Sequence, residues 1–75
     1  MSKNKSNPQA YRDILLASLS SGRGVDCKLC LKPIENREDI SVDHIKPRSK
    51  GGTSLFSNLQ PSHARCNRQK GDRVL

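Results

Sequence analysis

The sequence of 75 residues has few of the side chains that usually build a hydrophobic core. It contains one Phe, one Tyr and no Trp, and apolar residues make up only 32% of it. A single domain of this length buries only about 60% of the surface that its unfolded chain exposes, so apolar packing alone gives marginal stability. We therefore expect a bound metal ion to supply what the missing hydrophobic area does not.

The sequence also lacks a long apolar segment and an even number of cysteines. Its longest apolar run, residues 14–17, is far shorter than the roughly 20 residues that cross a bilayer, so we do not expect it to insert into a membrane. Three cysteines cannot all pair as disulfides, and the N-terminus shows no apolar signal segment. These absences predict a reducing, cytoplasmic setting in which the thiols bind metal.

Acidic residues are scarce in the second half of the chain. Residues 1–43 carry seven basic and six acidic side chains, whereas residues 44–75 carry seven basic side chains and one acid, Asp72. Such a concentration of positive charge favours a phosphate-bearing partner, and nucleic acid is the natural candidate. A basic surface that is merely solvated is the alternative interpretation.

Local patterns predict one α+β domain over residues 7–75, preceded by a disordered basic tail of residues 1–6. Asn7 and Pro8 are typical of a helix start, and Gly22 or Gly24 can end the helix that we expect over residues 8–21. A short strand should follow over residues 40–44, with a second strand at 55–60 and a final helix at 63–70. Ser62 is the expected N-cap of that helix and Gly71 its end. Four apolar side chains should share one face of the first helix: Tyr11, Ile14, Leu15 and Leu19.

Two pairs of potential metal ligands stand out from this background. Cys27 and Cys30 are separated by two residues, and so are His63 and Cys66. This spacing is typical of treble-clef-like zinc sites, in which three thiolates and one histidine fill the coordination of a structural Zn²⁺ ion. Buried apolar thiols and a surface-exposed His63 are the alternatives, and His44 is a second candidate for the histidine ligand.

Four further polar side chains lie between and beside these pairs: Asp43, His44, Asn58 and Asn67. The imidazole of His44 can act as a base near neutral pH. The oxygens of Asp43 and Asn67 are hard ligands suited to a divalent cation. The alternatives without a catalytic role are a structural His44, a loop-capping Asn58 and an exposed helical Asn67.

The order of these residues resembles the HNH endonuclease family in its His-Asn-Asn variant. His44 is followed after 13 residues by Asn58 and after 8 more by Asn67, the first two between the ligand pairs and the third directly after Cys66. The resemblance runs over residues 27–71 and includes the glycine pair Gly51-Gly52. It implies a small zinc-bound ββα-metal finger, here with an N-terminal packing helix over residues 8–21.

The resemblance also implies a role for each side chain. His44 would be the general base, and Asn58 would orient the loop and that base. Asp43 and Asn67 would hold the catalytic ion, which could be Mg²⁺, Mn²⁺ or Ni²⁺, while the structural Zn²⁺ stays with Cys27, Cys30, His63 and Cys66. Five basic residues are the expected DNA contacts: Lys46, Arg48, Arg65, Arg68 and Lys70.

The function expected from this resemblance is hydrolysis of DNA phosphodiester bonds, with low sequence specificity. One active site per chain predicts nicking by a monomer or weak dimer, leaving a 5′-phosphate and a 3′-hydroxyl. A cytoplasmic setting in a bacterium or a phage-infected host cell is expected, since small HNH proteins resemble those of phages, restriction systems and mobile elements. The rival functions are a non-catalytic zinc finger that binds nucleic acid and a zinc finger that docks onto a protein partner.

Overall fold

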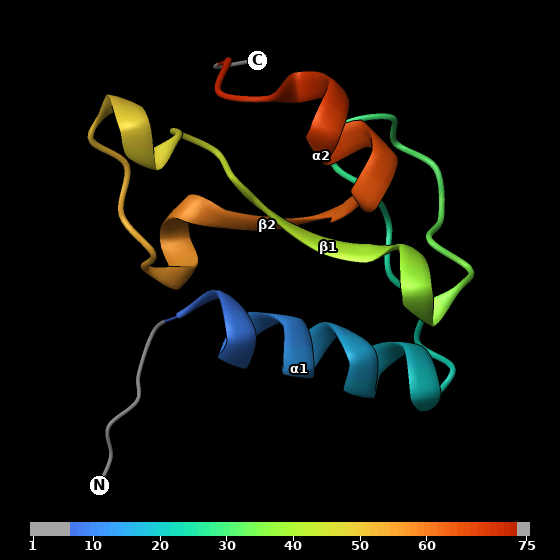
Figure 1. Cartoon of the computed structure of the whole chain (residues 1–75). Coiled ribbons are helices and arrows are strands. Elements are labelled where there is room, and N and C mark those ends of the chain that lie inside the picture. Colours follow the sequence, from blue (N-terminus) through green and yellow to red (C-terminus); the bar gives the residue numbers. More distant parts are fainter. Residues whose placement is uncertain (1–6, 74–75) are drawn as a thin grey trace, which may run out of the picture.

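The computed structural model describes residues 7–73 and has the predicted α+β fold. Helix α1 (Pro8–Ser20) is followed by strands β1 (Ile40–His44) and β2 (Leu59–His63) and by helix α2 (Ala64–Lys70). The strands form an antiparallel pair, and α1 and α2 cover opposite sides of it (Figure 1). Within the described residues, no helix is long and apolar enough to cross a membrane. The predicted tail of residues 1–6 lies outside the described range.

Helix α1 begins as its sequence predicts and ends one residue earlier than expected. The Asn7 side chain accepts a hydrogen bond from the Ala10 amide at 2.8 Å, and Pro8 occupies the first helical position. Leu15 is buried, but Ile14 is 51% exposed, contrary to expectation. At 3.6 residues per turn, a face centred on Leu15 leaves Ile14 at its margin. Three further side chains of α1 pack against the core: Tyr11, Leu16 and Leu19.

Strand β2 begins four residues later than predicted. The register pairs Ile40 with His63 and His44 with Leu59, and residues 56–58, which were predicted to lie in the strand, form a 3-10 turn instead. Pro61 is tolerated inside β2 because each strand of a two-stranded sheet has a free edge. Its carbonyl accepts a hydrogen bond from the Lys28 amide at 2.9 Å, which ties the first cysteine pair to the sheet.

The shift of β2 also changes the start of α2. Ser62 lies in the strand, fully buried, and does not cap the helix, so the prediction of a Ser62 N-cap was wrong. His63 is the residue before the helix, and its side chain makes no capping hydrogen bond because it faces the cysteines. The helix ends at Gly71, as predicted, in a positive-φ conformation.

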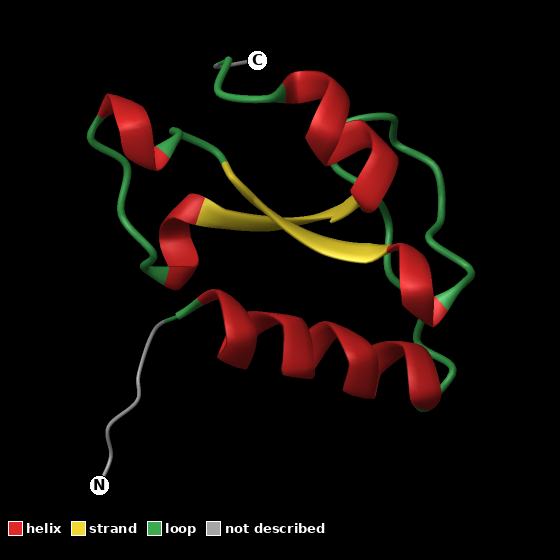
Figure 2. Cartoon of the chain, in the orientation of Figure 1, coloured by secondary structure: helices red, strands yellow, loops and turns green. Residues whose placement is uncertain are grey.

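The connection between the strands is a loop of residues 45–58 with 3-10 turns at Arg48–Lys50 and Phe56–Asn58 (Figure 2). Gly52 lies so close to the start of this loop that an added Cβ would be 1.7 Å from the Lys46 carbonyl oxygen. The Gly52 amide donates to the Pro47 carbonyl at 2.9 Å. Only glycine fits there, so the Gly51-Gly52 pair fixes the path of the loop beside the end of β1.

The hydrophobic core is small and includes sulfur ligands. Its buried members are Leu15, Val25, Cys27, Ile34 and Ile40, with the half-buried Cys30 and Cys66 packed against them. The three thiols therefore take the place of additional apolar side chains in and around this core. A metal ion bound there would join segments that are distant in sequence, as the small apolar content predicted.

Candidate functional site

Four side chains form a cluster with the geometry of a closed zinc site. The ligand atoms of Cys27, Cys30, His63 and Cys66 all lie within 4.8 Å of one another. His63 Nδ1 is 3.4 Å from Cys30 Sγ and 3.8 Å from Cys66 Sγ, close to the separation of about 3.6 Å expected for nitrogen and sulfur on a tetrahedral Zn²⁺. This is the predicted ligand set, and it contains His63 rather than His44.

The environment of the cluster favours the thiolate form of one cysteine, Cys27. Burial raises the pKa of Cys27, but the amides of Leu29, Cys30 and His63, each 3.4 Å from Cys27 Sγ, outweigh it together with the His63 ring and lower that pKa to about 6. Burial, with the neighbouring Cys30 and Cys27, raises the pKa of Cys66 to about 11. The cluster thus stabilises one negative charge and resists a second, a conflict that a bound cation removes.

A second constellation lies at the end of β1. Asp43, His44 and Asn67 line one open pocket of about 310 Å³, together with residues from the start of the inter-strand loop and with residues 71–72. Asp43 and His44 are the last two residues of β1, and Asn67 is at the middle of α2. The structure therefore brings together three of the four polar residues singled out in the sequence, while Asn58 lies outside the pocket lining.

The amide of Asn67 has a fixed orientation. Its Nδ2 donates to Ser41 Oγ at 2.9 Å and to the Val42 carbonyl at 3.0 Å. Because a carbonyl can only accept, the nitrogen must face β1, which leaves Oδ1 for a ligand. Amide and carboxylate oxygens are hard ligands of the kind that a divalent cation prefers, and Asn67 and Asp43 both line this pocket.

Asp43 already has a cationic partner in Lys70. Their side chains are 2% and 3% exposed, and Lys70 Nζ lies 2.9 Å from both carboxylate oxygens. The ammonium also donates to the His44 carbonyl at 2.7 Å, and Gln60 donates to Asp43 Oδ2 at 2.7 Å. Lys70 was expected to contact DNA, but its charge is buried against β1.

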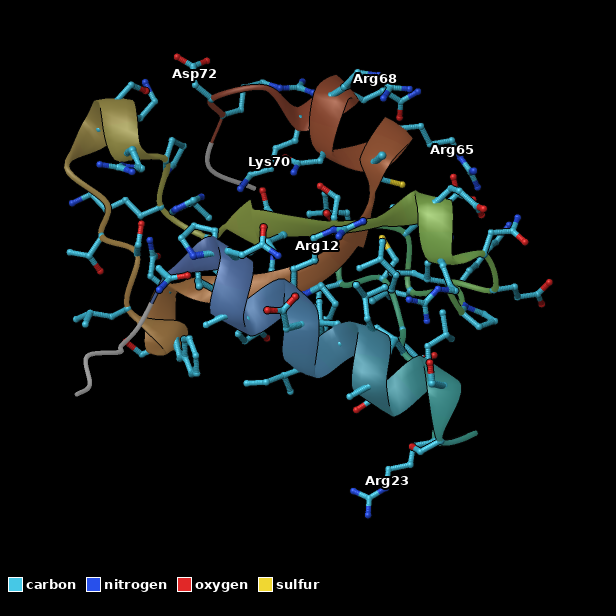
Figure 3. All side chains as sticks on the ribbon, turned by 60° about the horizontal axis from the view of Figure 1, so that its bottom comes forward. Arg12, Arg23, Arg65, Arg68, Lys70 and Asp72 are labelled. Atoms are coloured by element: carbon cyan, nitrogen blue, oxygen red, sulfur yellow. The ribbon has the colours of Figure 1, made fainter. Side chains whose placement is uncertain are left out.

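Figure 3 shows the difference between Lys70 and the other basic residues of α2. Arg65 and Arg68 project outward from the helix and are exposed, whereas Lys70 points toward the sheet. Lys70 follows Asn67 by three residues, so both lie on the same face of α2. That spacing was the signal in the sequence that could have placed Lys70 inside. Lys46 and Arg48 are exposed at the start of the loop.

His44 is half-buried and hydrogen-bonded through one ring nitrogen. Its Nε2 lies 3.2 Å from Ser54 Oγ. Burial lowers the pKa of His44, the Arg48 guanidinium lowers it further, and the Asp43 carboxylate acts in the opposite direction. The imidazole is therefore mainly neutral at pH 7, the state that a general base requires. No sequence pattern pointed to Ser54, because it is a loop serine outside any metal-ligand spacing.

Asn58 braces the loop and makes no hydrogen bond to His44. Its Oδ1 accepts from the Lys46 amide at 2.9 Å, and its Nδ2 donates to the carbonyls of Lys46 at 3.0 Å and Thr53 at 2.7 Å. Its own carbonyl accepts from the Ile45 amide. One side chain therefore closes both ends of the segment that lies beside the pocket.

Comparison with known proteins gives one match. A family model described as HNH endonuclease matches residues 27–73, more than half of the chain. No curated protein and no solved structure gives a significant match. The matched residues contain the cysteine–histidine cluster and the residues of the pocket, and they exclude α1.

Proposed function

Because the chain belongs to the HNH endonuclease family, we propose that it is a divalent-metal-dependent endonuclease that hydrolyses DNA phosphodiester bonds. The observation that carries this proposal is the pocket shared by Asp43, His44 and Asn67. It offers a neutral base beside two hard oxygen ligands, the minimum that hydrolysis of a phosphodiester needs.

His44 is the general base of the proposed reaction. With Nε2 engaged by Ser54, Nδ1 is the nitrogen that takes the proton from the attacking water. Asp43 and Asn67 would hold the catalytic Mg²⁺, Mn²⁺ or Ni²⁺ ion, which when bound supplies positive charge for the phosphate and the leaving oxygen. Asn67 is held in position by Ser41 and the backbone of β1.

Lys70 and Asn58 support these residues without contacting substrate. Lys70 links the end of α2 to Asp43 and to the His44 carbonyl, so it sets the spacing between the helix that carries Asn67 and the strand that carries the base. Asn58 holds the loop that faces His44. We assign both as positioning residues.

The exposed basic residues provide the DNA-binding surface in this proposal. Arg65 and Arg68 project from α2 (Figure 3), Arg48 lines the pocket, and Lys46 is exposed on the same loop. Contacts of this kind bind phosphates and do not read bases, so we expect weak sequence preference. One pocket per chain should cut one strand, and a monomer or weak dimer would nick duplex DNA.

The cysteine–histidine cluster has a structural role in this proposal. Four protein ligands fill the coordination of Zn²⁺ and leave no position for water or phosphate. Its place in the hydrophobic core supports a contribution to folding. Three thiols gathered on one metal are also consistent with the reducing cytoplasm expected from the sequence.

A non-catalytic nucleic-acid-binding module is the second candidate. One observation favours it: the Asp43 carboxylate is buried and already neutralised by Lys70, so a divalent ion has to share this carboxylate with an ammonium. Such a module would keep the zinc cluster and the exposed arginines and would have no use for His44.

Incubation with supercoiled plasmid separates the two candidates. The zinc-loaded wild type should produce nicked circles with Mg²⁺ or Mn²⁺ and none with EDTA, and His44→Ala should be inactive while retaining its fold and its affinity for DNA. Equal cutting by wild type and His44→Ala would indicate contamination. DNA binding by the wild type without cutting, across Mg²⁺, Mn²⁺ and Ni²⁺, would establish the non-catalytic module.

A further inference from the structure

We propose that Ser54 is a positioning residue that holds the His44 ring in the tautomer with the proton on Nε2, and that Asn58 acts on His44 through Ser54. This inference rests on the proposed function, because it concerns the base of that reaction. Its basis is the contact between His44 Nε2 and Ser54 Oγ at 3.2 Å. Within residues 7–73, Ser54 is the one hydrogen-bond partner of this ring.

The direction of the hydrogen bond decides whether His44 can act as a base. If Nε2–H donates to Ser54 Oγ, the lone pair resides on Nδ1, which is then able to accept a proton from water. If the hydroxyl donates to Nε2, Nδ1 carries the proton and both nitrogens are used. A serine hydroxyl can do either, so Ser54 as an acceptor is the arrangement that gives a base.

Ser54 is held in place by contacts on both sides of it along the chain. The carbonyl of Thr53 accepts from Asn58 Nδ2 at 2.7 Å, and the Thr53 hydroxyl accepts from the Leu55 amide at 3.4 Å. Ser54 itself is half-buried. A serine on a segment held in this way presents its oxygen to His44 at low entropic cost, which a mobile loop serine does not.

The same contacts give Asn58 a path to the base. Asn58 makes no hydrogen bond to His44, but it is hydrogen-bonded to Thr53, the residue before Ser54, and to the backbone of Lys46, two residues after His44. Loss of Asn58 should therefore free Ser54 and the ring together. The sequence predicted that Asn58 orients the loop and the base, and Ser54 supplies the connecting atom.

The first test observes the ring directly and does not require activity. The protein has two histidines, and the His63 ring belongs to the zinc cluster, so the His44 ring is readily assigned in zinc-loaded protein labelled with ¹⁵N-histidine. At pH 8 we expect a protected proton on Nε2 in the wild type and in Ser54→Thr. We expect its loss through exchange with water in Ser54→Ala and in Asn58→Ala.

The second test is kinetic. Ser54→Ala should lower kcat for plasmid nicking by roughly 10- to 100-fold, the usual loss for a residue that orients a functional histidine, with little change in KM. Ser54→Thr should restore the rate because it keeps the hydroxyl. Ser57→Ala is the matched control, since Ser57 is an exposed serine of the same loop, and it should behave as wild type. Thermal melting should show that all of these variants stay folded.

The two tests separate failure of this inference from failure of the proposed function. A proton on Nδ1 instead of Nε2 in the wild type would overturn the inference, and so would identical spectra for wild type and Ser54→Ala. If the wild type does not cut DNA, the function fails while the spectra still decide the role of Ser54. If the wild type cuts and Ser54→Ala cuts equally fast, this inference alone fails.

Discussion

The two histidines of this chain each end a strand, yet their surroundings direct them to different chemistry. His63 closes β2 and His44 closes β1, at opposite ends of the two-stranded ladder. His63 is 4% exposed and faces sulfur atoms, whereas His44 is half-buried in the wall of an open pocket with a hydroxyl as its partner. The same side chain is thus suited to a closed metal site in one place and to proton transfer in the other.

The comparison extends to how each region treats charge. The cluster gathers three thiols around one point and needs a cation to balance them. At the pocket, by contrast, the protein itself supplies the balancing positive charge, because the Lys70 ammonium neutralises the Asp43 carboxylate. The charges of the first region therefore call for a bound metal, whereas those of the second are balanced by the protein itself. In the proposed function this difference would correspond to a permanent structural ion in the first region and an exchangeable catalytic ion in the second.

Removal of the zinc cluster should have the largest effect. Cys30→Ala, or prolonged chelation of the wild type, should abolish the cooperative unfolding transition, because structural zinc contributes apparent free energies of about 10–16 kcal/mol in small domains. Circular dichroism and melting with and without added Zn²⁺ measure this.

Asn67→Ala is the control for the zinc-cluster variants, because Asn67 lines the pocket and does not belong to the cluster. It should stay folded, with a cooperative transition that is lowered only by the loss of its two hydrogen bonds to β1, but it should bind Mn²⁺ at least about tenfold more weakly in calorimetric titration. A cooperative transition that persists after complete zinc removal would show that the cluster does not hold the fold together.

Disruption of the Asp43–Lys70 pair should have the next largest effect. Lys70→Ala leaves a buried carboxylate without its partner, which typically costs about 3–5 kcal/mol. Arg68→Ala, on the same helix but exposed, should change stability by no more than about 0.5 kcal/mol. Urea unfolding of zinc-loaded protein measures both variants.

The double variant Asp43→Asn, Lys70→Met checks the cause of that loss. It removes both charges, so it should recover much of the stability lost in Lys70→Ala. If Lys70→Ala were as stable as Arg68→Ala, the pair would contribute little, and Lys70 could be a surface residue as the sequence first indicated.

The features that could be predicted from the sequence are those encoded in short stretches of neighbouring residues. The four candidate zinc ligands could be predicted because the two-residue spacing within each pair is a local signal. The turn at Gly51-Gly52 could be predicted because a pair of adjacent glycines is also a local signal. The inward position of Lys70 and the partner of His44 depend on how α2 and the loop pack on β1, which local patterns do not contain. The second strand was predicted to end at residue 60, before His63, because Pro61 resembles a strand breaker although an edge strand tolerates it.

A smaller effect is expected when the exposed arginines of α2 are removed. Arg65→Ala and Arg68→Ala should each weaken DNA binding uniformly across sequences and reduce the slope of log K against log salt by about 1. Arg23→Ala is the control, because Arg23 follows α1 on the other side of the sheet (Figure 3). Equal slopes for Arg23→Ala and Arg68→Ala would place the DNA-binding surface elsewhere. Fluorescence anisotropy at several salt concentrations measures the slopes.

The smallest effect sharpens the contrast between the two histidines. A lowered pKa means that His44 loses its proton at a lower pH than free imidazole, so kcat for nicking should rise with pH through that pKa and then level off near neutrality. Arg48 is one cause of the lowered pKa, second to burial. Arg48→Gln removes this positive charge, so the pKa of His44 should rise and the acid limb of the kcat profile should move to higher pH.

Arg65→Gln is the matched control for this shift, since Arg65 lies on the outer side of α2 (Figure 3) and is not among the groups that perturb His44. It should weaken DNA binding without moving the acid limb. The profiles should be measured at saturating DNA and at one fixed Mn²⁺ concentration, so that they report kcat. An acid limb that stays in place in Arg48→Gln would mean that a group other than His44 titrates in the rate-limiting step. His44 would then not be the general base, and the contrast drawn between the two histidines would be wrong.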